Sequence, residues 1–401
     1  MSELEHSRVT DSSMGSSHCD LFKCVEEIGR CEAGPAAFDV DLKARFPHEA
    51  IDALRRAKLL SASIPESLGG FGCSIEELAI MCEVLGQHCA STAMIFAMHH
   101  IQVASAVRHA GTSAYLKRYL SDLVEHQYLI GSVTSEVGVG GDLRASIAAV
   151  EASGGRFALN KDATTISYGN EADDLLVTAR RSTDAAPNDQ VIVLIHKADY
   201  SLEQTSKWDT MGMRGTCSPG FKLRAHGTVD QVFKVPFALV ATQTLLPYAH
   251  ILWCSCWLGI AKGAVANARS FVRAEARKNP GTVPPTALRL AEVSNLLQSM
   301  QQNIHAVRSD YEKKIATPNG LEYLSTMGFA LCMNNLKITC SQLAVQIVSA
   351  SLGICGISGY KNDSPYSLGR HLRDAHSAAL MIGNDRILAT NASLLLVYKD
   401  D

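Results

Sequence analysis

The chain has 401 residues, with 37 basic and 40 acidic side chains and a formal net charge of -3 at pH 7. This length exceeds what one small hydrophobic core supports, and 47% apolar against 19% charged residues excludes a largely disordered protein, so we expect two or three globular domains. The two signs of charge are interspersed, so the sequence lacks the basic field of a nucleic-acid-binding protein and we expect no nucleic-acid partner.

The first 20 residues are polar, and we expect a disordered N-terminus there. They contain no apolar core of a secretory signal, and no later run reaches the roughly 20 uncharged apolar residues that a bilayer requires. We therefore expect a cytoplasmic protein without a membrane partner. The 12 cysteines are scattered through apolar helical stretches, and the one tight pair, Cys254 and Cys256, lacks a second pair. Reduced core thiols and no metal site are expected.

Helical periodicity extends over residues 21–127, which we predict to form an N-terminal helical domain. Pro47 opens one helix. Ser74 and Glu77 have the spacing of a capping box and predict the start of another, with two further apolar helices before residue 127.

The pattern changes at residue 128 to short runs of period two, separated by turn residues, and this indicates a middle antiparallel β domain over 128–243. The predicted strands are Tyr128–Thr134, Phe157–Leu159, Asp174–Ala179, Val191–Ile195 and Thr228–Val235. Gly154 and Gly155 are predicted to form a turn between strands.

Helical spacing returns and continues to the end of the chain, which predicts a C-terminal four-helix bundle over 244–401. The first helix is expected to stop near Pro280, and the second is expected to begin at Pro285. The whole is therefore an α+β fold, and the groove between bundle and sheet is the default ligand site.

Four segments then become recognisable in order along about 310 residues. The first is SIPESLGGFG, the second SVTSEVGVGGD, the third the turn GMRGT after a tryptophan, and the fourth GISGY followed by two arginines and an aspartate. They occupy Ser63–Gly72, Ser132–Asp142, Trp208–Thr216 and Gly356–Asp374. Together they resemble the motifs of the acyl-CoA dehydrogenase superfamily.

The resemblance implies FAD and a set of hydroxyl, glycine and arginine residues that bind it. These are Ser132, Thr134, Ser135, Gly140, Gly141, Thr165, Ser167, Arg277, Gly356, Gly359 and Asn384. In the family a neighbouring subunit completes the site, which assigns Arg277, Gly356 and Gly359 to the flavin of another protomer. A homodimer or homotetramer is therefore implied.

The catalytic glutamate of the family is missing from this sequence. Its usual position holds Ile382, its alternative position holds Ala249, and neither side chain accepts a proton. Histidines are the replacement candidates: His250 beside the alternative position, and His99 and His100 on the helix that lines the family's pocket.

Three further sequence features bear on the site. His371 and His376 are ranked below the other histidines because helix-surface roles suit them better. Glu136 is assigned a structural role in the flavin loop. The family's tryptophan that covers one flavin face is replaced by Thr165, which opens space at the ring and makes access for O2 plausible.

Three functions remain open. The first is a dehydrogenase that oxidises an acyl thioester, on CoA or on an acyl carrier protein, by hydride transfer to flavin. Its electron acceptor would be an electron-transferring flavoprotein, and its substrate would be an unusual thioester of a specialised pathway. The second is a monooxygenase of the same fold that uses reduced flavin from a reductase, and O2. The third is a flavin- or acyl-binding homologue without turnover.

Overall fold

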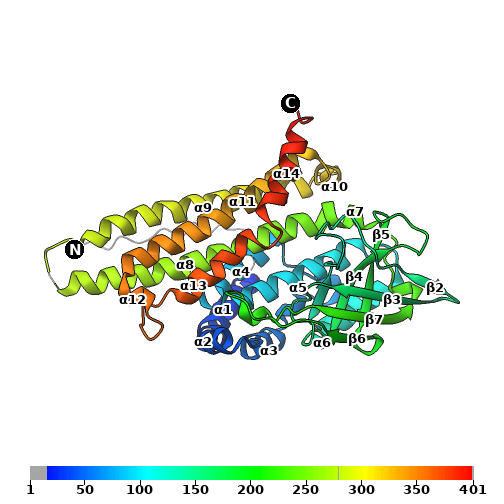
Figure 1. Ribbon diagram of the computed structural model, residues 1–401, viewed down its shortest axis with the longest axis horizontal. Helices are drawn as coiled ribbons and strands as arrows, with labels where there is room; N and C mark the ends of the chain where they lie inside the picture. Colours follow the sequence, from blue (N-terminus) through cyan, green and yellow to red (C-terminus); the bar gives the residue numbers. More distant parts are fainter. Residues whose placement is uncertain (1–15, 279, 400–401) are drawn as a thin grey trace.

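The computed structural model describes residues 16–278 and 280–399, and residues 1–15 of the segment expected to be disordered lie outside them. The first helix begins at Ser16, ahead of the predicted boundary at residue 21. Figure 1 shows a β domain at one end of an elongated molecule and long, side-by-side helices at the other.

The N-terminal helical domain is confirmed. Its helices are α1 (Ser16–Ile28), α2 (Gly34–Lys43), α3 (His48–Arg56), α4 (Ile75–His88), α5 (Ala90–His109) and α6 (Ala114–His126). The capping box is also confirmed: the Ser74 side chain accepts from the Glu77 N–H, and the Glu77 carboxylate accepts from the Ser74 N–H. These contacts satisfy two N–H groups that the first turn leaves free.

The middle domain contains seven strands in two sheets. They are β1 (Ile130–Val133), β2 (Glu151–Ser153), β3 (Arg156–Ala163), β4 (Asp174–Arg180), β5 (Gln190–His196), β6 (Tyr200–Gln204) and β7 (Phe221–Thr228). One sheet has the order β1-β4-β5 and the other β2-β3-β7-β6. The pairing is antiparallel except between β1 and β4, which run parallel.

The predicted strand Thr228–Val235 is wrong. Strand β7 ends at Thr228, the first residue of this segment, and Val229–Gln231 is a short 3-10 turn. Gln231 causes the turn, because its side chain accepts from the Thr228 N–H and closes a capping box. The alternating apolar residues of this segment therefore do not form a strand, because the turn at Gln231 interrupts them.

The C-terminal region is helical from Phe237, ahead of the predicted boundary at residue 244. Its helices are α7 (Phe237–Val240), α8 (Leu246–Lys278), α9 (Pro285–Ile315), α10 (Gly320–Tyr323), α11 (Met327–Cys355), α12 (Ile357–Tyr360), α13 (Gly369–His376) and α14 (Asn384–Leu395). The predicted stop before Pro280 and start at Pro285 are confirmed. The helices α8, α9 and α11 form the long bundle, with α13 packed on α8 and α11 (Figure 1).

Two of the described helical stretches are long and apolar enough to cross a membrane by length and composition alone. They are Phe237–Lys278 and Met327–Cys355, and 83% and 50% of their apolar windows are buried inside the protein. Core helices of a bundle meet the same criterion, so the finding is weak evidence for a membrane span.

Two glycines set how closely the N-terminal domain packs on the bundle. A Cβ on Gly86 of α4 would lie 2.6 Å from the Cys256 carbonyl oxygen, and a Cβ on Gly259 of α8 would lie 2.4 Å from the Glu83 backbone carbonyl oxygen. Both distances are far inside van der Waals contact, so only glycine allows this crossing. The tight contact fixes α4, and the adjoining α5, against α8.

A buried ion pair fixes the loop after β1. Glu136 accepts from the N–H groups of Ile147 and Ala148 and from the Ser146 hydroxyl, and its carboxylate lies 3.5 Å from the Lys161 Nζ. Both side chains are almost fully buried, and burial lowers the pKa of Lys161 to about 8. The structure therefore gives Glu136 the role of tying down both ends of loop 137–148.

Replacing Glu136 by alanine should lower the free energy of unfolding by about 3–5 kcal/mol, because the Lys161 ammonium would be left buried without its counter-ion. Urea unfolding at pH 7 measures the change. The matched control is Glu203→Ala, which removes a carboxylate from an exposed pair with Arg224 at 4.0 Å and should give no measurable change. Equal effects of the two substitutions would contradict this role of Glu136.

Candidate functional site

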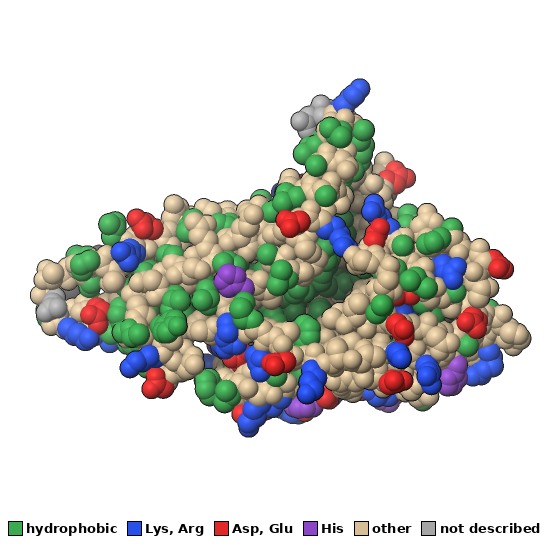
Figure 2. All heavy atoms as spheres, viewed as in Figure 1, with side chains coloured by type: hydrophobic (Ala, Val, Ile, Leu, Met, Phe, Trp, Pro, Cys, Tyr) green, Lys and Arg blue, Asp and Glu red, His purple; other side chains and the backbone are tan. Residues whose placement is uncertain are grey.

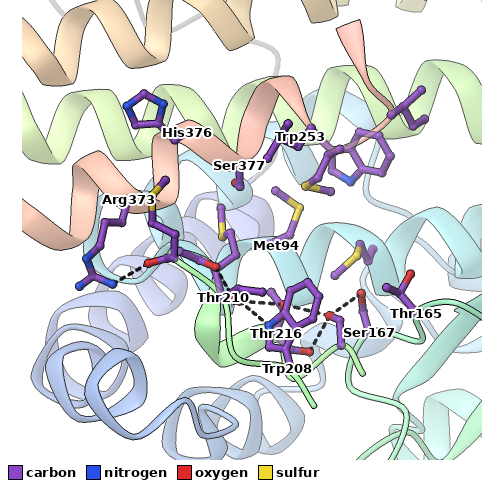
Figure 3. Close-up of a pocket in the computed structure, with 18 residues that line it drawn as sticks. Met94, Thr165, Ser167, Trp208, Thr210, Thr216, Trp253, Arg373, His376 and Ser377 are labelled. Carbon is purple, nitrogen blue, oxygen red and sulfur yellow. Dashed lines mark hydrogen bonds between the residues drawn. The ribbon is translucent and has the colours of Figure 1, made fainter. Parts of the chain in front are cut away.

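A cavity of about 530 Å³ lies where α5, two loops of the β domain, α8 and α13 meet. Figure 2 shows a hollow with hydrophobic side chains between the helical body and the β domain, and Figure 3 shows the cavity walls. The cavity size falls within the usual range for small-molecule sites. The lining residues are Met94, Met98, Thr165, Ser167, Trp208, Thr210, Met211, Gly212, Met213, Thr216, Ser218, Trp253, Arg373, His376, Ser377, Leu380, Met381 and Ile382.

Hydroxyl groups line the side of the cavity formed by the β domain. The Ser218 hydroxyl donates to the Ser167 oxygen at 2.9 Å and lies 2.9 Å from the Thr216 hydroxyl, which donates to a backbone carbonyl (Figure 3). Next to them, Ser135 pairs with both backbone groups of Thr165, at 2.7 and 3.1 Å. This wall offers donors and acceptors at fixed positions for the polar edge of a planar ring.

The loop after this wall has an open backbone. Gly138, Gly140 and Gly141 have φ of +92°, +59° and +75°, which disfavours any residue with a Cβ. The loop is open at Gly140, where a Cβ would meet nothing within 4 Å, whereas a Cβ on Gly141 would lie 2.8 Å from the Arg386 guanidinium of α14, which also donates to the Gly140 carbonyl. Together with the hydroxyl wall, this open glycine backbone fits a flavin.

A latch joins three parts of the chain at one side of the cavity. The Met213 N–H donates to the Asp374 carboxylate at 2.7 Å, and Arg373 of α13 pairs with Asp41 of α2. Gly212 lies so close to α13 that a Cβ there would be 2.2 Å from the Arg373 carbonyl oxygen. We refer to these five residues as the latch.

Asp374 is the buried acid of the latch. Burial raises its pKa from 3.8 to about 6, against the opposing effect of Arg370. The carboxyl reaches Met213 rather than the cavity, so its role in the structure is to hold the turn of β-domain residues against α13.

Ile382, where the resemblance leads us to expect the catalytic glutamate, lies in the cavity wall with φ of +54°. This left-handed conformation is strained for a β-branched residue. Buried Lys337 of α11 stabilises it, because the ammonium donates to the Ile382 carbonyl and to the Asn384 side chain, both at 2.7 Å. Burial lowers the pKa of Lys337 to about 8. Asn384 thus serves this contact and does not line the cavity.

The candidate base His99 does not line the cavity. It is fully buried, its Nε2 donates to the Leu60 carbonyl at 2.6 Å, and its Nδ1 accepts from the Ile130 N–H at 3.0 Å. Burial lowers its pKa to about 4. Both ring nitrogens are therefore occupied by backbone groups.

His100 and His250 are likewise absent from the cavity lining. His100 Nε2 lies 2.9 Å from the Leu59 carbonyl, and His250 Nδ1 lies 2.9 Å from the Met333 carbonyl. Burial lowers the pKa of His100 well below its usual value and that of His250 to about 4. The ring nitrogens of His100 and His250 that these contacts engage therefore face backbone groups, and neither histidine is among the described residues that line the cavity.

Most of the apolar side chains that line the cavity could not be identified from the sequence. Met94, Met98 and Trp253 reach the cavity from α5 and α8, and no motif marks them. His376, which was ranked low, lies at its exposed rim. The helical pattern places these side chains on helices but does not identify the face that meets the β domain.

The other expected flavin residues fall into two groups. Ser132, Thr134 and Ser135 lie at the end of β1 or just after it, on the same side as Thr165 and Ser167 of the cavity wall. Arg277 at the end of α8, Gly356 after α11 and Gly359 in α12 lie at the far end of the bundle (Figure 1). The second group is not brought to the cavity within one chain.

Comparison with known proteins gives a consistent result. The family model "Acyl-CoA dehydrogenase, N-terminal domain" matches residues 16–127, and "Acyl-CoA dehydrogenase, C-terminal domain" matches residues 251–386. The cyclohex-1-ene-1-carbonyl-CoA dehydrogenase of Syntrophus aciditrophicus is 25% identical over 94% of this chain and 89% of its own.

Solved structures show the same fold. Butyryl-CoA dehydrogenase from Megasphaera elsdenii aligns with a TM-score of 0.78 and 22% identity, over 96% of this chain and 100% of its own. The dibenzothiophene monooxygenase TdsC from Paenibacillus sp. A11-2, in complex with FMN and indole, aligns with a TM-score of 0.80 and 19% identity, over 96% and 98% of the two chains.

The latch predicts a pH dependence of stability. The pKa of Asp374 is higher in the folded than in the unfolded protein, so folding favours the protonated carboxyl. The resulting gain in the free energy of unfolding is complete below the unfolded pKa of 3.8 and is lost as the pH rises through the folded pKa of about 6. Asp374→Asn keeps the acceptor for Met213 and cannot ionise. Relative to the parent, the variant should gain up to about 3 kcal/mol of unfolding free energy between pH 4 and pH 7. Denaturant unfolding at several pH values measures this, and parallel curves for the two proteins would contradict it.

Proposed function

The chain belongs to the acyl-CoA dehydrogenase superfamily, and we propose that it is a flavin-dependent oxidoreductase that oxygenates an apolar substrate in the cavity described above. One observation carries the proposal: among the described residues that line the cavity, there is no aspartate or glutamate. The wall consists mainly of methionine, tryptophan, serine and threonine side chains.

The missing carboxylate argues against α-proton abstraction from a thioester. Such a base contributes typically 10²–10⁴-fold to a rate. Ile382 and Ala249, which hold the two positions where the resemblance expects a glutamate, are apolar, and His250, next to Ala249 in the sequence, contacts a backbone carbonyl. Oxygenation requires no such base in the wall.

FAD is the proposed cofactor, and the hydroxyl wall and open glycine backbone would hold it. When bound there, a reduced flavin would supply two electrons, so that one atom of O2 enters the product and the other is released as water. Ser167, Thr216 and Ser218 would bind the polar edge of the ring. Met94, Met98 and Trp253 would exclude water from the opposite side of the cavity, where the substrate would lie.

The partners follow from this assignment. A flavin reductase that uses a nicotinamide cofactor would deliver the electrons, and the protein would act in the cytoplasm. A homodimer or homotetramer would bring Arg277, Gly356 and Gly359 of one protomer to the flavin of another, because these residues lie at the far end of the bundle from the cavity of their own chain.

Dehydrogenation of an acyl thioester, on CoA or on a carrier protein, is the second candidate. The similarity in sequence to cyclohex-1-ene-1-carbonyl-CoA dehydrogenase over almost the whole chain favours it. Hydrogen bonds to the thioester carbonyl would then have to lower the pKa of the α-hydrogen in place of a carboxylate base. An electron-transferring flavoprotein would be the electron acceptor.

Anaerobic reduction of the bound flavin separates the two candidates. Because no aspartate or glutamate is among the described lining residues, butyryl-CoA should bleach the visible absorbance of the FAD-loaded protein slowly, since loss of such a base typically lowers the rate at least about a hundredfold. NADH with a flavin reductase should bleach it rapidly. Dithionite provides the control that the flavin is reducible. Exposure of the reduced protein to O2 and acetophenone should then give hydroxylated product, and rapid bleaching by the thioester would contradict the oxygenase assignment.

A further inference from the structure

Trp253 of α8 carries a buried hydrogen-bond donor without an acceptor. Its indole N–H has no partner within the described part of the chain. An indole nitrogen donates and cannot accept, so only an added acceptor satisfies it. Since the ring of Trp253 forms part of the cavity wall (Figure 3), a ligand in the cavity is the group placed to supply that acceptor.

The other indoles of the region set Trp253 apart. Trp208 also lines the cavity, but its N–H already donates to the Met213 carbonyl at 3.2 Å. Trp257, one turn after Trp253 on α8, also has an unpaired N–H, but it is fully buried and is not among the cavity-lining residues. Trp253 alone among the three combines an unpaired donor with a place in the cavity wall.

The surroundings of Trp253 indicate the kind of molecule that would carry the acceptor. Five methionines line the cavity, Met94, Met98, Met211, Met213 and Met381. Thioether sulfurs make favourable contacts with aromatic rings and adapt to their shape. An aromatic or similarly flat apolar molecule therefore suits this cavity better than a charged one.

Few other polar groups are left for such a ligand. Arg373 is engaged by Asp41 and by the Met211 carbonyl, and the Ser377 hydroxyl donates to the Asp374 carbonyl. The hydroxyl wall is assigned to the flavin, and His376 lies at the exposed rim. On the α8 side, one donor therefore determines the orientation of the ligand.

We propose that Trp253 is a substrate-recognition residue, whose N–H donates to an oxygen acceptor on an otherwise apolar, aromatic substrate. The inference rests on the proposed function for the identity of the reaction, but the recognition itself requires only binding. The ligand class is an aromatic ketone, aldehyde, ester or phenol rather than a bare hydrocarbon.

Calorimetric titration of the FAD-loaded protein tests this without turnover. Acetophenone and isopropylbenzene have similar shapes, but only the ketone has an acceptor. The parent protein should bind acetophenone roughly tenfold more tightly than isopropylbenzene, the effect expected from one otherwise unpaired buried donor. In Trp253→Phe, which keeps an aromatic ring and removes the N–H, the two affinities should become equal.

Two variants serve as matched controls. Trp208→Phe removes a cavity indole whose N–H is already paired, and Trp257→Phe removes an unpaired indole outside the cavity wall. Both should retain the tenfold preference. Equal binding of the two ligands by the parent protein, binding of neither, or a preference that survives in Trp253→Phe would overturn the proposal. Because no catalysis is measured, failure of the oxygenase assignment would leave this result unaffected.

Discussion

The latch between the β domain and α13 is the constraint on which the site depends. The Met213 N–H on Asp374 and the Arg373–Asp41 pair tie residues from all three domains at one edge of the cavity. Gly212 permits the contact, because a Cβ there would overlap the Arg373 carbonyl. The hydroxyl wall and the side chains of α5 and α8, Met94, Met98 and Trp253, can enclose one ligand space only while the latch holds the domains together.

The fold could largely be predicted from local chemistry. The capping box at Ser74, the helix stop before Pro280 and the helix start at Pro285 all lie where the sequence places them, because capping and proline act within a few residues. The strand expected over Thr228–Val235 was wrong because a side-chain turn at Gln231 outweighed an alternating pattern. The parallel pairing of β1 with β4 depends on contacts distant in sequence, which the local pattern does not report.

The site was less predictable than the fold. Thr165 and Ser167 both line the cavity. A motif could point to them because the two residues lie close together in the sequence. The sequence does not show that His99 and His100 contact the Leu60 and Leu59 carbonyls rather than the cavity. Trp253 has no motif, and its unpaired N–H exists only in the folded arrangement. The absence of a carboxylate at Ile382 was visible in the sequence, and the structure adds that no neighbouring acid in the described cavity wall replaces it.

The central claim is that a flavin ring lies between the hydroxyl wall of the β domain and the cavity residues that follow α13. A crystal structure of the protein soaked with FAD tests it most directly. We predict density for the isoalloxazine ring with its polar edge on Ser167, Thr216 and Ser218 and one face toward Met381 and Ile382. A flavin bound elsewhere, or a cavity that stays closed by its own side chains in saturating FAD, would contradict it.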